Sequence, residues 1–183
     1  NSIEPKYFLP IIPTVLLNGS SGIAVGFATN ILNRNPVDLI DACLKVLDGK
    51  KVGKLLPWWN EYKGPVEQVT GTNQYVMRGQ YRVTNTTTVE ISELPPSITF
   101  QKYEAHLNSL QDRGIIFSYD DNSSDGINYT LKFSRATLAD LIAKDRLDQT
   151  LKMVETETEN LTCLDERGKL IIFDNIPQVV EYF

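Results

Sequence analysis

The sequence predicts a mixed α/β fold of the α+β kind, with a mainly antiparallel sheet and flanking helices. Hydrophobic residues make up 42% of the 183 residues, which is enough for a substantial core. Several segments are rich in Val, Thr and Tyr and lie between turn residues, whereas others have apolar positions at helical spacing. No run of about eighteen apolar residues occurs, so we expect no membrane span.

The first half of the chain predicts one helix followed by a sheet. Apolar side chains recur at helical spacing over residues 36–47, with Asn35 as a cap and Pro36 at the first helical position. Three β segments follow, with turn residues between them. We expect these to form an antiparallel sheet of strands 66–70, 75–83 and 87–93.

The second half alternates helices and strands. Thr99 and Ser134 are predicted to cap helices, and the polar residues 120–126 are typical of a turn. The predicted elements are a helix at 99–110, strands at 115–119 and 127–133, a helix at 134–143, a hairpin of 161–164 with 170–173, and a helix at 176–183.

Residues 18–30 are the most informative stretch. They follow the apolar run 11–17, lead into a further helix-like segment, and place three glycines, two serines and two asparagines around Ile23. Glycine permits backbone geometries closed to other residues and leaves no side chain to hold a partner away. The composition therefore predicts a loop built for close approach.

Short motifs in a fixed order along the chain indicate a known family. They are Glu4-Pro5, Leu9-Pro10, Ile12-Pro13, Leu16-Leu17-Asn18-Gly19, Ser21-Gly22-Ile23-Ala24-Val25-Gly26, Pro57-Trp58, Tyr62-Lys63-Gly64, Glu90-Ile91-Ser92-Glu93-Leu94-Pro95, Gln101-Lys102-Tyr103, and Leu164-Asp165 through Phe173-Asp174. With them, the chain resembles the breakage-and-reunion subunit of type IIA DNA topoisomerases over nearly its whole length. Short linkers, and Asn30-Ile31-Leu32-Asn33 where cellular enzymes usually have a proline, make it most similar to the medium subunits of T4-type phage enzymes.

The resemblance implies a domain organisation. Residues 1–36 would be the C-terminal part of a winged-helix DNA-gate domain, and residues 37–160 a tower domain. Residues 161–183 would form a hairpin and the start of a coiled-coil helix.

The resemblance also implies a reaction, double-strand passage. In this family a tyrosine attacks a DNA phosphodiester, leaving a 5'-phosphotyrosyl link on each strand, and a second duplex passes through the gap before resealing. That tyrosine and its neighbouring arginine lie before a segment like Glu4-Pro5, and Tyr7 does not match it. We therefore expect a fragment without a catalytic residue of its own.

The implied partners belong to the full enzyme. They are double-stranded DNA, a second copy of the breakage-and-reunion subunit, and a large subunit that carries the ATPase and metal sites, with no membrane. Mg²⁺ and ATP are expected to act through those other domains or subunits, and no metal on this chain. The compartment implied is the cytoplasm, that of a bacterial host if a phage encodes the chain.

Ile23 has the most specific implied role, because the matching isoleucine of the family intercalates and bends the gate duplex. Apolar wedges of this kind unstack base steps at a cost of about a few kcal/mol per step. The expected DNA-binding residues are Ile23, Asn18, Ser20, Ser21, Asn30, Lys51, Lys54, Lys63, Lys102 and Tyr103. Two alternatives stay open: Ile23 packs beneath a glycine-rich turn, or the lysines are ordinary solvated side chains.

Charge is distributed unevenly. Residues 1–60 carry six basic and four acidic side chains, whereas the whole chain has a net charge of −5. Acidic residues gather around 155–166. We therefore expect a polyanion to be tolerated near the 18–30 motif and to be repelled near residues 155–166.

Other functions fit the sequence less well. The 18–30 motif lacks the Gly-Lys-Ser/Thr ending of a nucleotide loop, and the polar loop 120–126 lacks the ligand spacing of a calcium site. His106 is the only histidine and is interpreted as a surface or helix-packing residue, and Cys43 and Cys163 as buried, reduced thiols. The remaining alternative is a non-enzymatic interaction or scaffold module whose sheet docks protein partners.

Overall fold

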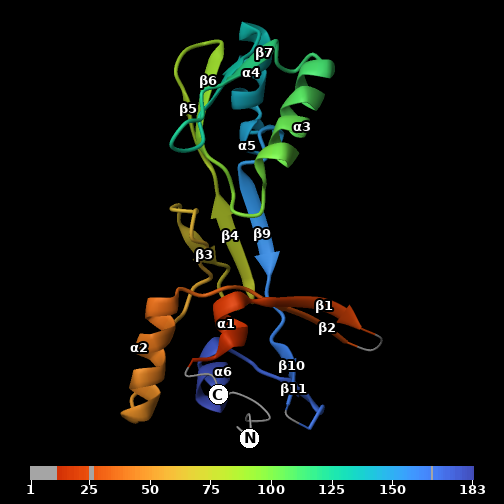
Figure 1. Cartoon of the computed structure of the whole chain (residues 1–183). Coiled ribbons are helices and arrows are strands. Elements are labelled where there is room, and N and C mark those ends of the chain that lie inside the picture. Colours follow the sequence, from red (N-terminus) through yellow and green to blue (C-terminus); the bar gives the residue numbers. More distant parts are fainter. Residues whose placement is uncertain (1–11, 25–26, 166) are drawn as a thin grey trace, which may run out of the picture. The chain divides into compact units, whose positions relative to one another are not determined.

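The computed structural model describes residues 12–24, 27–165 and 167–183, which form two compact units (Figure 1). Unit 1 combines the described residues up to Trp59 with Gln68–Tyr75 and Thr158–Phe183, and unit 2 combines Asn60–Glu67 with Val76–Glu157. Helices and antiparallel strands occur in both units, so the predicted mixed α+β class is confirmed. Within the described ranges, no helix is long and apolar enough to cross a bilayer.

The described residues of unit 1 form two antiparallel hairpins and three helices. Its elements are α1 (Thr14–Asn18), β1 (Ser20–Ala24), β2 (Phe27–Ile31), α2 (Pro36–Leu47), β10 (Thr162–Leu164), β11 (Leu170–Ile172) and α6 (Ile176–Tyr182). Leu16 of α1, Leu39 of α2 and Val179 of α6 are fully buried in one hydrophobic cluster. Unit 1 therefore has its own core, to which all three helices contribute.

Unit 2 is a four-stranded antiparallel sheet with helices. Its elements are β5 (Gln80–Val83), β6 (Thr88–Glu93), β7 (Ser118–Asp121), β8 (Tyr129–Lys132), α3 (Phe100–Asp112), α4 (Arg135–Ala143) and α5 (Leu147–Thr150). The sheet order is β5-β6-β8-β7, and β6 pairs with β8 so that Ile91 faces Tyr129. Both of these side chains are buried in a cluster with Leu107 of α3 and Leu138 of α4.

A three-stranded sheet contains residues of both units. It has the order β3-β4-β9, and its strands are β3 (Val66–Gln68), β4 (Gln74–Arg78) and β9 (Val154–Thr158). The boundary between the two units falls inside all three strands. Unit 2 is therefore an insertion in the sequence of unit 1.

The predicted helix starts are confirmed by their caps. The side-chain oxygen of Asn35 accepts a hydrogen bond from the Val37 amide at 2.9 Å, and Pro36 occupies the first position of α2. Thr99 and Ser134 cap α3 and α4 in the same way. The predicted hairpin near the C-terminus is also confirmed, since β10 pairs antiparallel with β11.

The predicted sheet of strands 66–70, 75–83 and 87–93 is wrong in its grouping. The middle segment is two strands, β4 and β5, interrupted at Gly79, whose amide donates to the Met153 carbonyl at 2.7 Å. A Cβ at position 79 would lie 2.6 Å from the Glu93 carbonyl oxygen, so only glycine fits there. The chain leaves one sheet at this point and enters another.

His106 makes the stability of unit 2 depend on pH. Its ring Nε2 lies 2.7 Å from the Thr150 carbonyl, and burial lowers the pKa of the imidazole below its usual value of 6.5, with Lys152 and Arg113 acting in the same direction. The unfolded chain therefore takes up this proton first as the pH falls.

We expect the contribution of His106 to be complete above about pH 6.5 and to be lost as the pH falls through the folded-state pKa. Urea midpoints between about pH 8 and about pH 5 measure it. His106→Gln should flatten this part of the profile. An identical acid-side decline in both proteins would assign the effect to other groups.

Candidate nucleic-acid interface

Strands β1 and β2 form an antiparallel hairpin after the short helix α1, which corrects the prediction of a loop leading into a helix. Strands β1 and β2 pair antiparallel from Ser20 opposite Ile31 to Ala24 opposite Phe27. Gly19 enters the hairpin with φ of 69°, and a Cβ there would lie 2.7 Å from the Ile31 carbonyl oxygen. Gly19 thus permits a close approach, but the approach is between two parts of this chain, residues 19 and 31.

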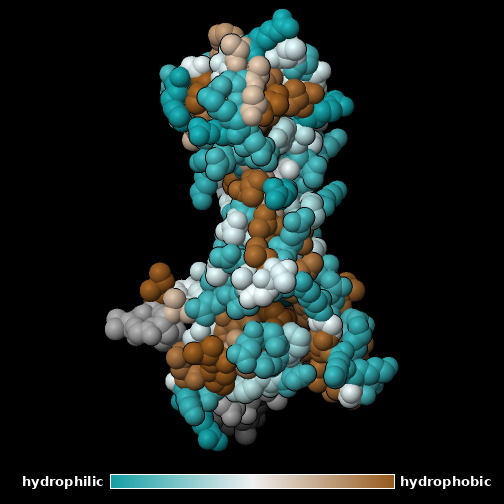
Figure 2. Space-filling view, turned by 180° about the vertical axis from the view of Figure 1, so that it is seen from behind, coloured by the Kyte–Doolittle hydropathy of each residue, from teal (hydrophilic) through white to brown (hydrophobic). Residues whose placement is uncertain are grey.

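Ile23 is exposed near the end of this hairpin. Its side chain is 92% exposed, the highest value among the large exposed hydrophobic side chains of the described residues. The neighbouring Ser20, Ser21 and Gly22 are exposed as well. Figure 2, seen from behind, shows a small hydrophobic group at the hairpin, which extends from the rest of unit 1 in Figure 1. The alternative that Ile23 packs beneath a turn is therefore wrong.

The polar residues of the motif fall into two groups. Asn18, Ser20 and Ser21 are exposed, and their side chains form no hydrogen bond with another described residue. Asn30 is half-buried, and its Nδ2 donates to the Thr158 carbonyl at 2.7 Å. Only the first three offer free donors to a ligand.

A buried ion pair lies at the base of the hairpin. Arg34 and Glu159 are 1% and 3% exposed, and two hydrogen bonds of 2.6 and 2.8 Å join the guanidinium to the carboxylate. Arg34 also donates to the carbonyls of Leu32 and Leu55, and the Leu32 amide donates to Glu159 at 2.9 Å. The pair thus connects the end of β2, the segment around residue 55 and the end of β9.

This buried pair changes which charges of the sequence are available at the surface. Arg34 was one of six basic residues in the first sixty, and Glu159 belonged to the acidic cluster. Because each neutralises the other inside the protein, neither acts on a polyanion at the surface. The free basic groups of unit 1 lie elsewhere.

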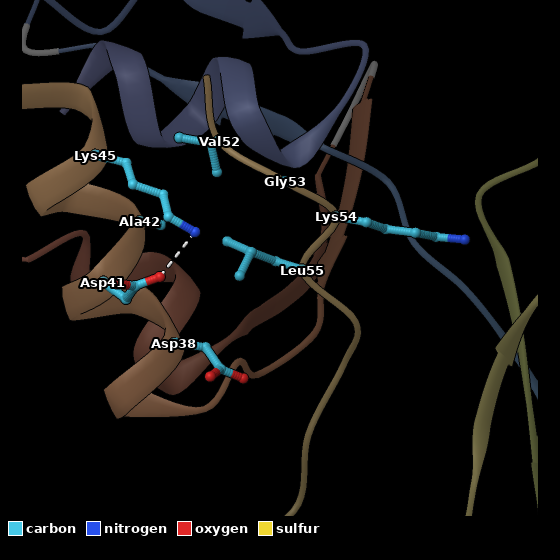
Figure 3. Close-up of a pocket in the computed structure, with 8 residues that line it drawn as sticks. All are labelled: Asp38, Asp41, Ala42, Lys45, Val52, Gly53, Lys54 and Leu55. Carbon is cyan, nitrogen blue, oxygen red and sulfur yellow. Dashed lines mark ion pairs between the residues drawn. The ribbon is translucent and has the colours of Figure 1, made fainter. Parts of the chain in front are cut away.

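Lys51 and Lys54 are exposed and form no salt bridge with a described residue. Lys54 borders a pocket of about 230 Å³ between α2 and residues 52–55. Figure 3 shows its side chain pointing away from the pocket, whereas Lys45 turns towards Asp41 and pairs with it at 3.0 Å. Lys54 is therefore available to an anion outside the pocket, and Lys45 is not.

Three of the predicted residues lie in unit 2. Lys63 and Lys102 are exposed. Tyr103 is fully buried, its hydroxyl donates to the Leu151 carbonyl at 2.9 Å, and its ring lies 5.7 Å from that of Tyr129. A side chain without exposed surface cannot contact DNA. The prediction that Tyr103 binds DNA is therefore wrong, and Tyr103 belongs to the core of unit 2.

Within the described residues, the remaining reactive side chains do not form a second site. Among the residues that the structure describes, no three His, Cys, Asp or Glu side chains gather so that they could hold a metal ion, and these residues do not fit a Mg²⁺ site. Cys43 and Cys163 are free and half-buried, and burial raises the pKa of both thiols. Thiols with raised pKa values are poor nucleophiles.

Comparisons with known proteins cover the whole chain. The family model that describes the A subunits of DNA gyrase/topoisomerase IV matches residues 1–183. The DNA topoisomerase medium subunit of Enterobacteria phage T4 is 35% identical over 185 residues, which are 99% of this chain and 41% of that protein. DNA topoisomerase 2 of Plasmodium falciparum is 34% identical over 173 residues, 92% of this chain and 12% of that protein. The chain thus spans about two fifths of the phage relative and less of the other.

The fold has a solved counterpart. A crystal structure of the DNA-binding, cleavage and re-ligation domain of Plasmodium falciparum topoisomerase II superposes with a TM-score of 0.86 at 32% identity, over 98% of this chain and 25% of that one. Sequence and fold agree on the same relatives. The chain therefore belongs to the family of DNA gyrase/topoisomerase IV A subunits.

Proposed function

We propose that this chain is the DNA-binding and DNA-bending part of the cleavage and religation core of an ATP-dependent type IIA DNA topoisomerase. Family membership over all 183 residues supports this, as do relatives named for DNA topoisomerase activity. Within that enzyme we assign residues 1–36 to the end of a winged-helix domain, 37–160 to a tower domain and 161–183 to a hairpin with the start of a coiled coil. The interaction-module alternative is not favoured, because the relatives found are DNA topoisomerases.

The observation that carries the proposal is the exposure of Ile23. An isoleucine that is 92% exposed at a hairpin of serines and glycine buries nothing within the described structure. Inserted between two base pairs, the same side chain leaves water and unstacks the step, and this kinks a duplex. The exposed side chain thus fits an intercalating wedge.

The polar neighbours fit contacts to the DNA backbone. Asn18, Ser20 and Ser21 carry free hydrogen-bonding groups around the wedge, and such groups fix register on phosphates without reading sequence. Lys51, Lys54, Lys63 and Lys102 would neutralise further phosphates, each adding to the salt dependence of binding. Tyr103 has no part in this interface.

The rest of the reaction is assigned outside these residues. We place none of the covalent chemistry on this chain, and we propose that Mg²⁺ and ATP act through other domains or subunits. The partners we propose are double-stranded DNA, an ATPase large subunit, plus a second copy of the breakage-and-reunion subunit, in the cytoplasm of a bacterial host. What this chain contributes is binding, orientation and bending of the duplex.

Ile23→Ala should reduce both bending and affinity for a duplex of about 25 base pairs labelled with a fluorescence donor and acceptor at its ends. The change removes three carbon atoms at about 0.8 kcal/mol each, so we expect the Kd to rise about 50-fold. Energy transfer at saturating protein measures the bend, and a titration at low salt measures the Kd.

The matched control is Ile172→Ala, which removes an equally large side chain that is 71% exposed on another hairpin of unit 1. It should leave both quantities unchanged. Equal bending by the wild type and by Ile23→Ala would overturn the wedge. Absence of any binding at low salt would overturn the DNA-binding function as a whole.

A further inference from the structure

Strand β2 is fastened to a segment far away in the sequence, residues 158–160. The backbone amide of Asn30 donates to the Asn160 carbonyl at 3.1 Å, and the Asn160 amide donates back to Asn30 at 2.9 Å. The Asn30 side chain adds a bond of 2.7 Å to the Thr158 carbonyl, and the Thr29 hydroxyl one of 3.4 Å to Asn160. We call Thr29, Asn30 and residues 158–160 the hairpin clamp.

The clamp is joined to the interior of unit 1. Glu159, at its centre, accepts the Leu32 amide and is held by the buried guanidinium of Arg34. Ile31, next to Asn30, is 3% exposed in the core cluster of this unit. The hairpin thus has one fixed end, at residues 29–32, and one end that carries the exposed Ile23.

The chemistry of Asn30 separates it from the other polar residues of the motif. Its side-chain amide already donates a short hydrogen bond to a backbone carbonyl, whereas Ser20 and Ser21 are free and exposed. A phosphate would have to compete with that bond for the Nδ2 group. Asn30 is therefore suited to hold the hairpin, and the serines are suited to contact a ligand.

A fixed hairpin is what a wedge requires. A two-stranded hairpin is only marginally stable by itself, so it would bend away from a base step instead of opening it. Interactions that pre-organise a binding element increase its effect without touching the ligand.

We propose that Asn30 and its partners at residues 158–160 hold the β1–β2 hairpin in the orientation from which Ile23 bends DNA, so that Asn30 is a positioning residue and not a phosphate contact. The inference rests on the proposed function of Ile23. The inference assigns a part in DNA bending to residues 158–160, which lie outside the 18–30 motif.

The first test compares Asn30→Ala with Asn18→Ala on the same labelled duplex. Asn30→Ala removes the side-chain bond to the Thr158 carbonyl and so loosens the clamp. It should at least halve the change in energy transfer at saturating protein and increase the hydrogen exchange of the β1 and β2 amides. Asn18→Ala removes a proposed phosphate contact, so it should weaken binding and leave the saturated bend and the exchange unchanged.

The second test restores the clamp without the Asn30 amide. Asn30 and Asn160 exchange two backbone hydrogen bonds, and Cα atoms of such pairs lie about 5.5 Å apart, within the range for a disulfide. Asn30→Cys with Asn160→Cys, in a Cys43→Ala and Cys163→Ala background, should bend DNA weakly when reduced and like its parent when oxidised.

The outcomes separate the inference from the function on which it rests. The positioning role is overturned by equal bending of oxidised and reduced protein, or by a wild-type bend in Asn30→Ala, provided that Ile23→Ala still reduces the bend. If Ile23→Ala bends DNA normally, the wedge itself fails, whatever the clamp variants do. Two exchange results would support the clamp independently of DNA. The β1 and β2 amides should exchange faster in Asn30→Ala than in the wild type, and in the double-cysteine variant they should exchange more slowly when it is oxidised than when it is reduced.

Discussion

Arg34→Met is expected to destabilise unit 1 by about 3–5 kcal/mol, because it leaves the Glu159 carboxylate buried without its counter-charge. The cost of an unpaired charge in the interior far exceeds the small hydrophobic gain of the methionine. The carbonyls of Leu32 and Leu55 lose their donor at the same time. Trp58 and Trp59 both lie in unit 1, so tryptophan fluorescence during urea unfolding measures the loss.

A surface pair provides the matched control. Lys45 and Asp41 approach to 3.0 Å on α2, but their side chains are 44% and 63% exposed. Lys45→Met should therefore change the free energy of unfolding by less than about 0.5 kcal/mol.

The double variant Arg34→Met with Glu159→Leu tests the cause. Removing both charges should recover part of the loss, but not all, because the Leu32 amide and both carbonyls stay unpaired. A double variant as unstable as the sum of the two single variants would show that the two charges are not coupled.

Tyr103→Ala is expected to destabilise unit 2 by about 3–5 kcal/mol, because it empties a fully buried aromatic position. Tyr103→Phe keeps the ring but removes the bond to the Leu151 carbonyl, and should cost about 1 kcal/mol. Hydrogen exchange of the β6 and β8 amides measures both losses inside unit 2.

The neighbouring Lys102→Ala is the control, since this side chain is exposed and should change stability by about 0.5 kcal/mol or less. With Tyr103→Phe, DNA affinity under folding conditions should equal that of the wild type. Weaker DNA binding at unchanged stability would instead return Tyr103 to the interface.

The features that sequence reasoning predicts well are those with local causes. Asn35, Thr99 and Ser134 cap helices through their own neighbours, within two or three residues. The burial of Tyr103 also had a local signal, because Tyr103, Leu107 and Leu110 follow one face of α3. Had this helical spacing been given more weight than the ability of an aromatic side chain to contact DNA, Tyr103 would have been assigned to the core.

The features that sequence reasoning missed depend on distant partners. Glycines and serines in residues 18–24 are typical of a loop, and they form a strand only because β2 pairs with them and residues 158–160 hold β2. Strand β9 was hidden among acidic residues, although Val154, Thr156 and Thr158 alternate with glutamates. No local pattern could join Arg34 to Glu159, which are 125 positions apart.

The insertion of unit 2 into the sequence of unit 1 has a consequence for synthesis. The last residue of unit 2 to be synthesised is Glu157, whereas Arg34 must wait for Glu159, which is added 125 residues after it. At about 5–20 residues per second, that delay is about 6–25 seconds. Unit 1 therefore cannot complete its interactions before the residues of unit 2 have been synthesised. Throughout this interval the hairpin that carries Ile23 lacks its hydrogen bonds to residues 158–160.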